Sequence, residues 1–249
     1  MEVRKNNLWY WFSATIFHLG IFLSTTGFAL ADNPENKLGN WIGATSATRF
    51  SDSWSLFLQG ELRTWEMASN LNELLFRVAG HYDFSPKIMG AFGYVRVDTW
   101  PFEENRGLRK FYENRLYEEL LIKQGWGKAK VNHRFRLEQR WLKVEGETQY
   151  SNRARYMLQY TRPLSGESIQ PGTNFVKLFN EVFIDFDRFG YWFTLQAGKK
   201  GLNQNRLYAG LGRQLTPASS LQLGVLWQHR PSADFFRLVL AYSFNFDLR

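Results

Sequence analysis

The feature that most constrains this chain is a repeated alternation of apolar and polar residues. From residue 53 to 247, alternating segments of about ten to thirteen residues are separated by glycine and polar turn residues. In the stretch HRFRLEQRW, residues 133–141, charged side chains occupy the even positions from 134 to 140, and mostly apolar ones occupy the odd positions. Successive side chains of a strand point to opposite faces, so each segment predicts a strand with one polar and one apolar face.

Ten strands are predicted from this pattern, and no segment after residue 31 has a helical period. Their ranges are 54–63, 74–83, 87–98, 114–125, 128–142, 151–162, 175–187, 203–215, 219–229 and 235–247. Residues 40–50, NWIGATSATRF, also have strand character. An eleventh strand would put the N-terminus on the wrong side of a barrel with an even number of strands. Either one further strand makes twelve, or residues 40–50 lie inside the barrel or along its seam.

The N-terminus predicts a secretory signal peptide at residues 1–31. Arg4 and Lys5 precede a largely apolar run that ends in small residues at Ala31, and a polar stretch follows. Cleavage there would leave residues 32–249 as a single domain. A membrane-anchoring helix is the alternative interpretation.

Composition narrows the class of protein further. The net charge of +8 invites a nucleic-acid partner, but the basic residues are spread along the chain without a binding motif, and export argues against that partner. The lack of cysteine excludes disulfides and thiolate metal sites. An exported chain with no second spanning helix can cross a bilayer only as a closed barrel, because lipid cannot satisfy open backbone groups. The sequence therefore predicts an all-β fold, an antiparallel transmembrane β-barrel of about 10–12 strands.

Connection lengths and the last strand agree with a barrel of the outer membrane. Residues 235–247 alternate up to the aromatic Phe246 and resemble the segment by which such barrels are recognised for assembly, so the expected partners are the lipid bilayer and the outer-membrane assembly machinery. Working back from a periplasmic C-terminus, the longer connections fall outside and the short ones inside, as expected. The outer ones are 99–113, 143–150, 188–202 and 230–234, and the long inner exception is 163–174.

The polar strand faces are then expected to line the barrel interior, with the apolar faces against lipid. Opposite charges on neighbouring strands should pair there, because isolated buried ions are costly. If the acidic residues reach the arginines, side chains close the interior; if they do not, a positive ring favours anions. The predicted interior network consists of Arg134, Arg136, Glu138, Arg140, Arg153, Arg155, Glu181 and either Glu118 or Glu119.

Several motifs resemble, in order, the bacterial family known as domain of unknown function 2490. They are RFRLEQRW at 134–141, RARYMLQYTRPL at 153–164, NEVFIDF at 180–186, NQNRLYAGLGRQL at 203–215 and LQLGVLWQ at 221–228. The resemblance extends more weakly to the N-terminal third through Trp41 and WSLFLQGELR at 54–63. It implies an outer-membrane barrel of Gram-negative bacteria and brings no established activity.

The chain shows no catalytic motif, and no catalytic, metal or cofactor-binding residue is predicted. The pairs Ser85 with His81 and Ser151 with His133 could be imagined as nucleophile and base, but ordinary hydrogen bonding is the favoured interpretation of both histidines. Asn203, Asn205 and Arg206 are likewise interpreted as structural. Three functional classes remain, in this order: a barrel with a structural or interaction role, a narrow anion-leaning channel for small solutes, and a lipid-modifying enzyme.

Overall fold

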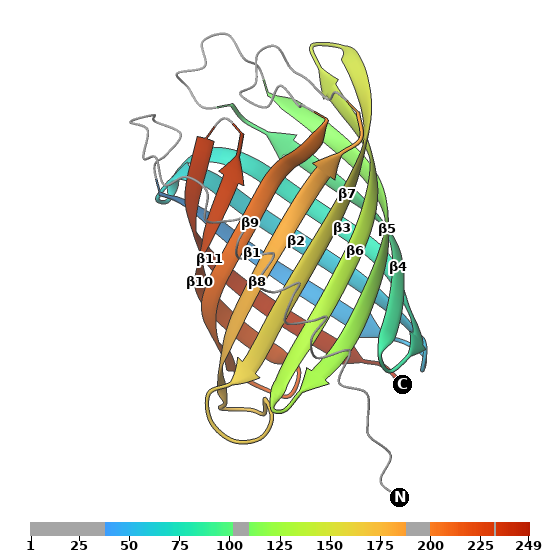
Figure 1. Cartoon of the computed structure of the whole chain (residues 1–249), viewed down its shortest axis with the longest axis vertical. Helices are drawn as coiled ribbons and strands as arrows, with labels where there is room; N and C mark the ends of the chain where they lie inside the picture. The colour runs from blue at the N-terminus through green and yellow to red at the C-terminus, as the bar shows by residue number, and fades with distance from the viewer. Residues whose placement is uncertain (1–37, 102–109, 188–199, 232) are drawn as a thin grey trace, which may run out of the picture. The chain divides into compact units, whose positions relative to one another are not determined.

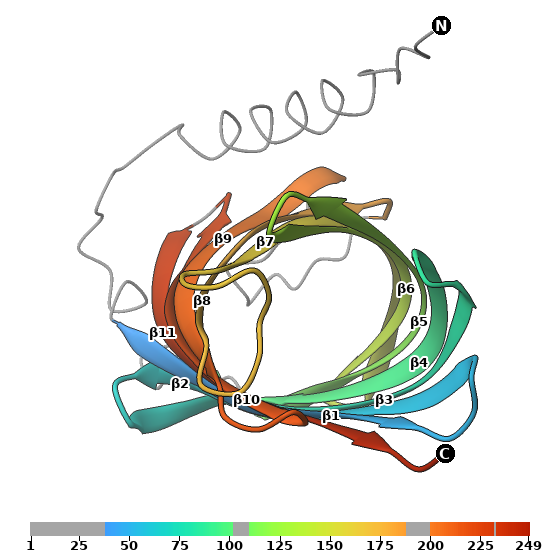
Figure 2. The same ribbon diagram turned by 90° about the horizontal axis from the view of Figure 1, so that it is seen from below.

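A computed structural model describes residues 38–101, 110–187, 200–231 and 233–249. Within these ranges the chain forms eleven strands that close into a barrel (Figure 1). Seen from below, the strands form a continuous ring (Figure 2). None of the described residues belongs to a helix long and apolar enough to cross a membrane. The predicted signal peptide, 1–31, lies outside the described residues.

Consecutive strands are hydrogen-bonded neighbours around the ring. Their bounds are β1 (Gly39–Arg49), β2 (Trp54–Glu66), β3 (Ser69–Ser85), β4 (Ile88–Thr99), β5 (Phe111–Trp126), β6 (Ala129–Val144), β7 (Glu147–Pro163), β8 (Asn174–Asp185), β9 (Gly201–Gln214), β10 (Ser219–Arg230) and β11 (Ala233–Asp247).

Strand β1 is the seam that closes the barrel. It pairs antiparallel with β2 and parallel with β11, in a register that runs from Gly39 opposite Arg237 to Arg49 opposite Asp247. The Thr45 hydroxyl donates a hydrogen bond to the Ser243 hydroxyl across this seam at 3.0 Å. Of the alternatives for residues 40–50, the seam is confirmed, and a twelfth strand or a segment inside the barrel is wrong. A parallel closure permits an odd number of strands, which the expectation of an even-stranded barrel had excluded.

The predicted outer connection at 143–150 is wrong. Strands β6 and β7 continue through most of it and meet in a two-residue turn at Glu145 and Gly146, whose φ angles are 49° and 93°. Positive φ at both central residues is the geometry of a type I′ turn, which fits the right-handed twist of paired strands. Strands β4 and β8 end, and strands β5 and β9 begin, at this same end of the barrel, whereas the connection 164–173 lies at the other.

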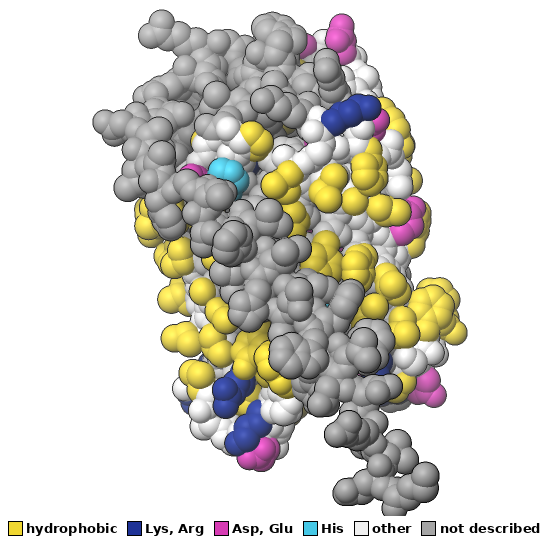
Figure 3. All heavy atoms as spheres, viewed as in Figure 1, with side chains coloured by type: hydrophobic (Ala, Val, Ile, Leu, Met, Phe, Trp, Pro, Cys, Tyr) yellow, Lys and Arg dark blue, Asp and Glu magenta, His cyan; other side chains and the backbone are white. Residues whose placement is uncertain are grey.

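The alternation of HRFRLEQRW sorts its side chains as predicted. Arg136 and Glu138 face the barrel interior and are 4% and 1% exposed, whereas Phe135 and Leu137 face outward and are 45% and 51% exposed. On the visible part of one face, hydrophobic side chains cover the middle, and most charged ones lie toward the two ends (Figure 3). The outer wall is therefore mostly apolar at mid-height.

Glycines in β9 and β10 make room for aromatic side chains inside the barrel. A Cβ atom added to Gly212 would collide with the Phe175 ring, and one added to Gly210 would collide with the Tyr208 hydroxyl. A Cβ atom on Gly224 would lie 2.6 Å from the same hydroxyl. The absence of side chains at these positions is what lets the two rings fill the interior beside β9.

The seam predicts a specific cross-link. In the double variant Thr45→Cys/Ser243→Cys, oxidation should form an intramolecular disulfide, because the two side chains are register partners already in contact. The chain has no native cysteine to compete. The cross-linked species is detected by its mobility on non-reducing gels. In the control Thr45→Cys/Ala241→Cys, the second position is offset by two residues on the same face. Equal cross-linking of both folded variants would contradict this register.

Candidate functional site

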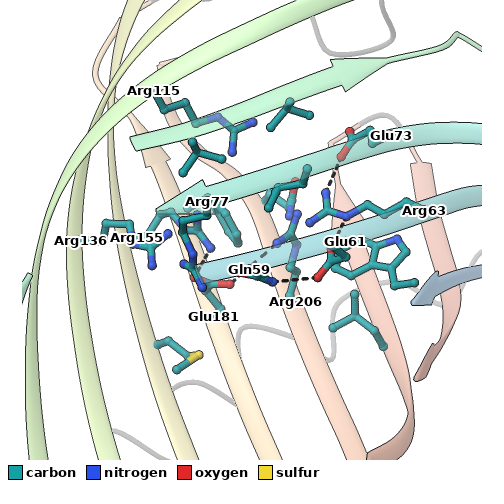
Figure 4. A pocket seen from close by; sticks show the side chains of 18 of the residues that line it. Gln59, Glu61, Arg63, Glu73, Arg77, Arg115, Arg136, Arg155, Glu181 and Arg206 are labelled. Atoms are coloured by element: carbon teal, nitrogen blue, oxygen red, sulfur yellow. Dashed lines mark hydrogen bonds and ion pairs between the residues drawn. The ribbon is translucent and has the colours of Figure 1, made fainter. Parts of the chain in front are cut away.

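The barrel encloses a cavity of about 430 Å³ to which all eleven strands contribute lining residues. Its wall is rich in cationic side chains, several of which are drawn in Figure 4. The basic residues that line it are Arg63, Arg77, Arg115, Arg134, Arg136, Arg140, Arg153, Arg155, Lys177, Arg206 and Arg230. Because every strand alternates, each of these side chains reaches the interior while its sequence neighbours face outward.

Glu138 on β6 lies at the centre of the charged wall and is 1% exposed. Arg153 donates to its carboxylate from Nε at 2.8 Å and from a terminal nitrogen at 2.5 Å. Arg155 donates to the other oxygen at 2.6 Å, and Arg136 lies 3.6 Å away. One buried carboxylate is therefore shared by three guanidinium groups. Such charge-assisted hydrogen bonds offset part of the cost of burying the ions.

Two further carboxylates continue this network onto β5 and β8. Glu181 accepts hydrogen bonds from Arg155 at 2.6 Å and Arg134 at 2.5 Å. Glu119 accepts from Arg136 at 2.5 Å and lies 3.6 Å from Arg134. The structure thus brings these predicted residues together through shared carboxylates.

Glu118 does not belong to the network, because it faces outward in an exposed position. Its carboxylate accepts a hydrogen bond from the Gln139 side chain at 3.1 Å on the outer wall. The sequence left Glu118 and Glu119 as alternatives because the two are adjacent, and only one of them can face the interior. The inclusion of Glu118 among the interior residues is therefore wrong.

The remaining predicted arginine, Arg140, belongs to a second group. It donates to Glu113 at 2.5 Å, and Arg115 donates to the same carboxylate at 2.6 Å. Asp185 lies 3.8 Å from Arg140. Neither Glu113 nor Arg115 was predicted, although both fall on the interior side of β5 together with Glu119.

A third group spans β1 to β3 and was also missed. Arg63 donates to Glu61 at 2.5 Å and forms an ion pair with Glu73. Its guanidinium stacks on the Trp41 ring at 3.9 Å, and that of Arg206 lies 4.8 Å from the same ring. Alternation had placed Glu61 and Arg63 on the polar face of their strand, but nothing local to the sequence connects them with Arg206.

Aromatic rings hold several of the buried cations. The Phe183 ring is approached by Arg155 at 4.4 Å, Arg206 at 4.7 Å and Arg153 at 5.2 Å. The face of an aromatic ring attracts a cation, most strongly where water is excluded. Phe183 therefore gives three guanidinium groups a common surface and leaves their N–H groups free to meet carboxylates or a solute.

Two lining cations have no carboxylate partner. In the ranges that the structure describes, neither Arg77 nor Lys177 lies within 4.0 Å of an acidic oxygen. The Arg77 guanidinium lies 4.6 Å from the Phe57 ring, and its Nε atom is buried without a hydrogen-bond partner. These side chains keep hydrogen-bonding capacity that the rest of the described barrel does not use.

The interior also has an apolar sector. Ala79, Val95, Val97 and Tyr117 pack together on the inner faces of β3, β4 and β5. Arg136 lies over the Tyr117 ring at 4.2 Å, where the apolar sector meets the charged wall. Arg77 and Arg115 also lie on the inner faces of β3 and β5, so the apolar sector and the charged wall share these strands.

The imagined catalytic pairs do not assemble. Ser151 lies on the inner face of β7, whereas His133 lies on the outer face of β6 and hydrogen-bonds the Tyr156 hydroxyl at 2.9 Å. His81 stacks on Phe57 at 5.2 Å, and the Ser85 hydroxyl accepts hydrogen bonds from the backbone of the following turn.

Of the three residues singled out near the start of β9, two make structural hydrogen bonds and one lines the cavity. Asn203 hydrogen-bonds Asp185, and Asn205 accepts a hydrogen bond from Asn180 at 2.7 Å. The structural interpretation therefore holds for both asparagines. Arg206, by contrast, lines the cavity and is part of the candidate site.

Comparison with known protein families identified a match over most of the chain. The model of a family described as "Protein of unknown function (DUF2490)" matches residues 38–237. Neither the search of curated proteins nor the search of solved structures gave any match.

The charged wall predicts that two acid-to-amide substitutions differ greatly in their effect on stability. Glu138→Gln should lower the free energy of unfolding by about 3–5 kcal/mol, because it leaves Arg153 and Arg155 buried without their shared carboxylate. Glu118→Gln, the matched control on the outer wall, should change it by no more than about 0.5 kcal/mol. Guanidinium unfolding in detergent micelles, followed by tryptophan fluorescence, measures both. Similar losses for the two variants would refute the assigned orientations.

Proposed function

The chain belongs to the DUF2490 family of proteins of unknown function, and we propose that it is an outer-membrane β-barrel whose interior forms a narrow anion-selective passage. The observation that carries the proposal is the excess of cationic side chains around the cavity. Eleven basic residues line it. Among the residues that the structure describes, seven acidic ones line the cavity or form ion pairs with its arginines: Glu61, Glu73, Glu113, Glu119, Glu138, Glu181 and Asp185.

An outer-membrane location is supported by the outer wall and by the closure of the barrel. Leu137, Phe92 and Leu223 are each more than half exposed on the outward faces of their strands. Such side chains are favourable against lipid, and a closed ring leaves no unpaired strand edge. The N-terminal sequence supports export, and the alternating last strand β11 supports insertion by the outer-membrane assembly machinery of a Gram-negative cell.

Anion selectivity follows from the sharing of carboxylates. Glu138 and Glu181 each serve more than one guanidinium, so pairing does not neutralise the wall. A passage lined by surplus positive charge lowers the energy of an anion inside it and raises that of a cation. The same side chains keep the passage narrow, which suits small solutes.

The ion pairs also favour a second candidate, a barrel plugged by its own side chains with a structural or interaction role. Arg136 and Glu138 are almost completely buried, as expected of a closed interior. The two candidates differ in conductance. The lipid-modifying enzyme has no comparable support, because the imagined catalytic pairs do not assemble.

The proposed outer-membrane location predicts the cell fraction in which the protein is recovered. Expressed with its N-terminal segment, the chain should be recovered with outer membranes and should migrate differently in boiled and unboiled gel samples. The variant Leu137→Arg should assemble poorly, because a charge on the lipid face at mid-depth costs about 2–4 kcal/mol. Gln170→Arg, in an exposed connection, is the control and should assemble normally. Recovery of the unaltered protein in the soluble periplasmic fraction would overturn the location.

The passage predicts a selective conductance. In planar bilayers with asymmetric potassium chloride, the reversal potential should favour chloride. Arg136→Gln should move it toward zero, because this change removes an interior charge and frees the carboxylate of Glu119. Arg213→Gln, on an exposed part of β9 where the arginine donates to Asn174 at 3.1 Å, should leave it unchanged. Correctly folded protein without any conductance would favour the plugged barrel.

A further inference from the structure

We propose that the interior binds oxyanions of the phosphate class that carry two or more negative charges, at a site formed by Arg77, Arg134 and Lys177. Such a site would make the proposed passage selective among anions. The site rests on the proposed function in one respect, because the anion must reach the interior from solution. Three strands, β3, β6 and β8, bring its residues to one cavity.

Arg77 supplies the clearest unused donor. Its side chain reaches from β3 into the cavity that also receives Arg136 and Arg155 (Figure 4). No described carboxylate lies within ion-pair distance of it, and its Nε atom is buried without a hydrogen-bond partner beside the Phe57 ring. A buried donor without a partner is costly, and an acceptor from a bound solute would offset that cost.

Lys177 and Arg134 extend the positive charge across the cavity. Arg134 shares the Glu119 carboxylate with Arg136. The Arg136 guanidinium lies 4.2 Å from the Tyr117 ring, and that of Arg77 lies 6.0 Å from the same ring. The Nε atom of Arg134 is buried without a hydrogen-bond partner, although its terminal nitrogen is bound to Glu181. Lys177 lines the same cavity from β8, and its side chain has no hydrogen bond or ion pair with another described residue. The three residues therefore present positive charge to one cavity, where a bound anion would offset it.

The number of unmatched charges favours a multivalent anion over chloride. Five arginines on β6, β7 and β9 share three carboxylates on β5, β6 and β8, those of Glu119, Glu138 and Glu181. Arg77 on β3 and Lys177 on β8 add two more cations. One divalent oxyanion can neutralise two of these charges at once. Its several oxygens also match the donors of a guanidinium and a lysine, which a spherical ion cannot do. A cavity of about 430 Å³ has room for phosphate or a small phosphate ester.

Binding can be measured apart from conductance. The purified protein in detergent is titrated with inorganic phosphate by calorimetry, at constant ionic strength maintained with chloride. The variants Arg77→Gln and Lys177→Gln should each weaken phosphate binding by about tenfold, the effect expected for the loss of one charge-assisted hydrogen bond. Lys130→Gln removes the same charge from an exposed position near the start of β6, outside the set of residues that line the cavity, and should leave binding unchanged. The gel shift on boiling verifies that each variant is folded.

The same proteins are then tested in bilayers, where phosphate should reduce the chloride current of the unaltered protein and should reduce it less in Arg77→Gln. The outcomes separate the two proposals. Chloride-selective current without phosphate binding overturns the site and leaves the passage intact. Phosphate binding without current supports the site and overturns the passage. Equal phosphate affinity in Arg77→Gln, Lys177→Gln and the unaltered protein places the bound anion elsewhere and overturns the site.

Discussion

The parallel pairing of β1 with β11 is the constraint on which the rest of the structure depends. Without it, β1 and β11 would be open edges with unpaired backbone groups, and the interior would not be enclosed. The Trp41 ring of β1 stacks with Arg63 of the neighbouring β2, and closure brings Arg206 of β9 to the same ring. The enclosed cavity and its electrostatics both follow from this one pairing.

Inside the closed barrel, the energetic cost of burying charged side chains opposes the function proposed for them. Burying an arginine without a full countercharge is unfavourable, yet the chain does so repeatedly around the cavity. Shared carboxylates and the rings of Phe183, Tyr117 and Phe57 compensate for much of this cost. Among the described residues, Arg77 and Lys177 are left without a carboxylate within 4.0 Å. A barrel needed only as a scaffold could fill this space with apolar side chains, as β3, β4 and β5 do in part.

The sequence predicted much of this from local pattern alone. Alternation assigned Arg136 and Glu138 to the interior and Leu137 to the outer wall, because the side-chain period of a strand is fixed. It could not choose between Glu118 and Glu119, since the adjacent apolar residues of β5 permit either face inward. The turn at Glu145 and Gly146 was missed because polar residues around it resemble a loop. Arg63 and Arg206 meet at Trp41 only through barrel closure, which no local pattern encodes.

The odd number of strands has a consequence for how the molecule is oriented. Since β1 and β11 run in the same direction, the first strand starts at one rim of the barrel and the last strand ends at the opposite rim. In an antiparallel ring with an even number of strands, both points would lie at the same rim. Short reporter tags placed just before Gly39 and just after Asp247 would therefore occupy opposite sides of any bilayer that the barrel spans. A circular permutant that joins these two points would need a linker as long as the barrel wall.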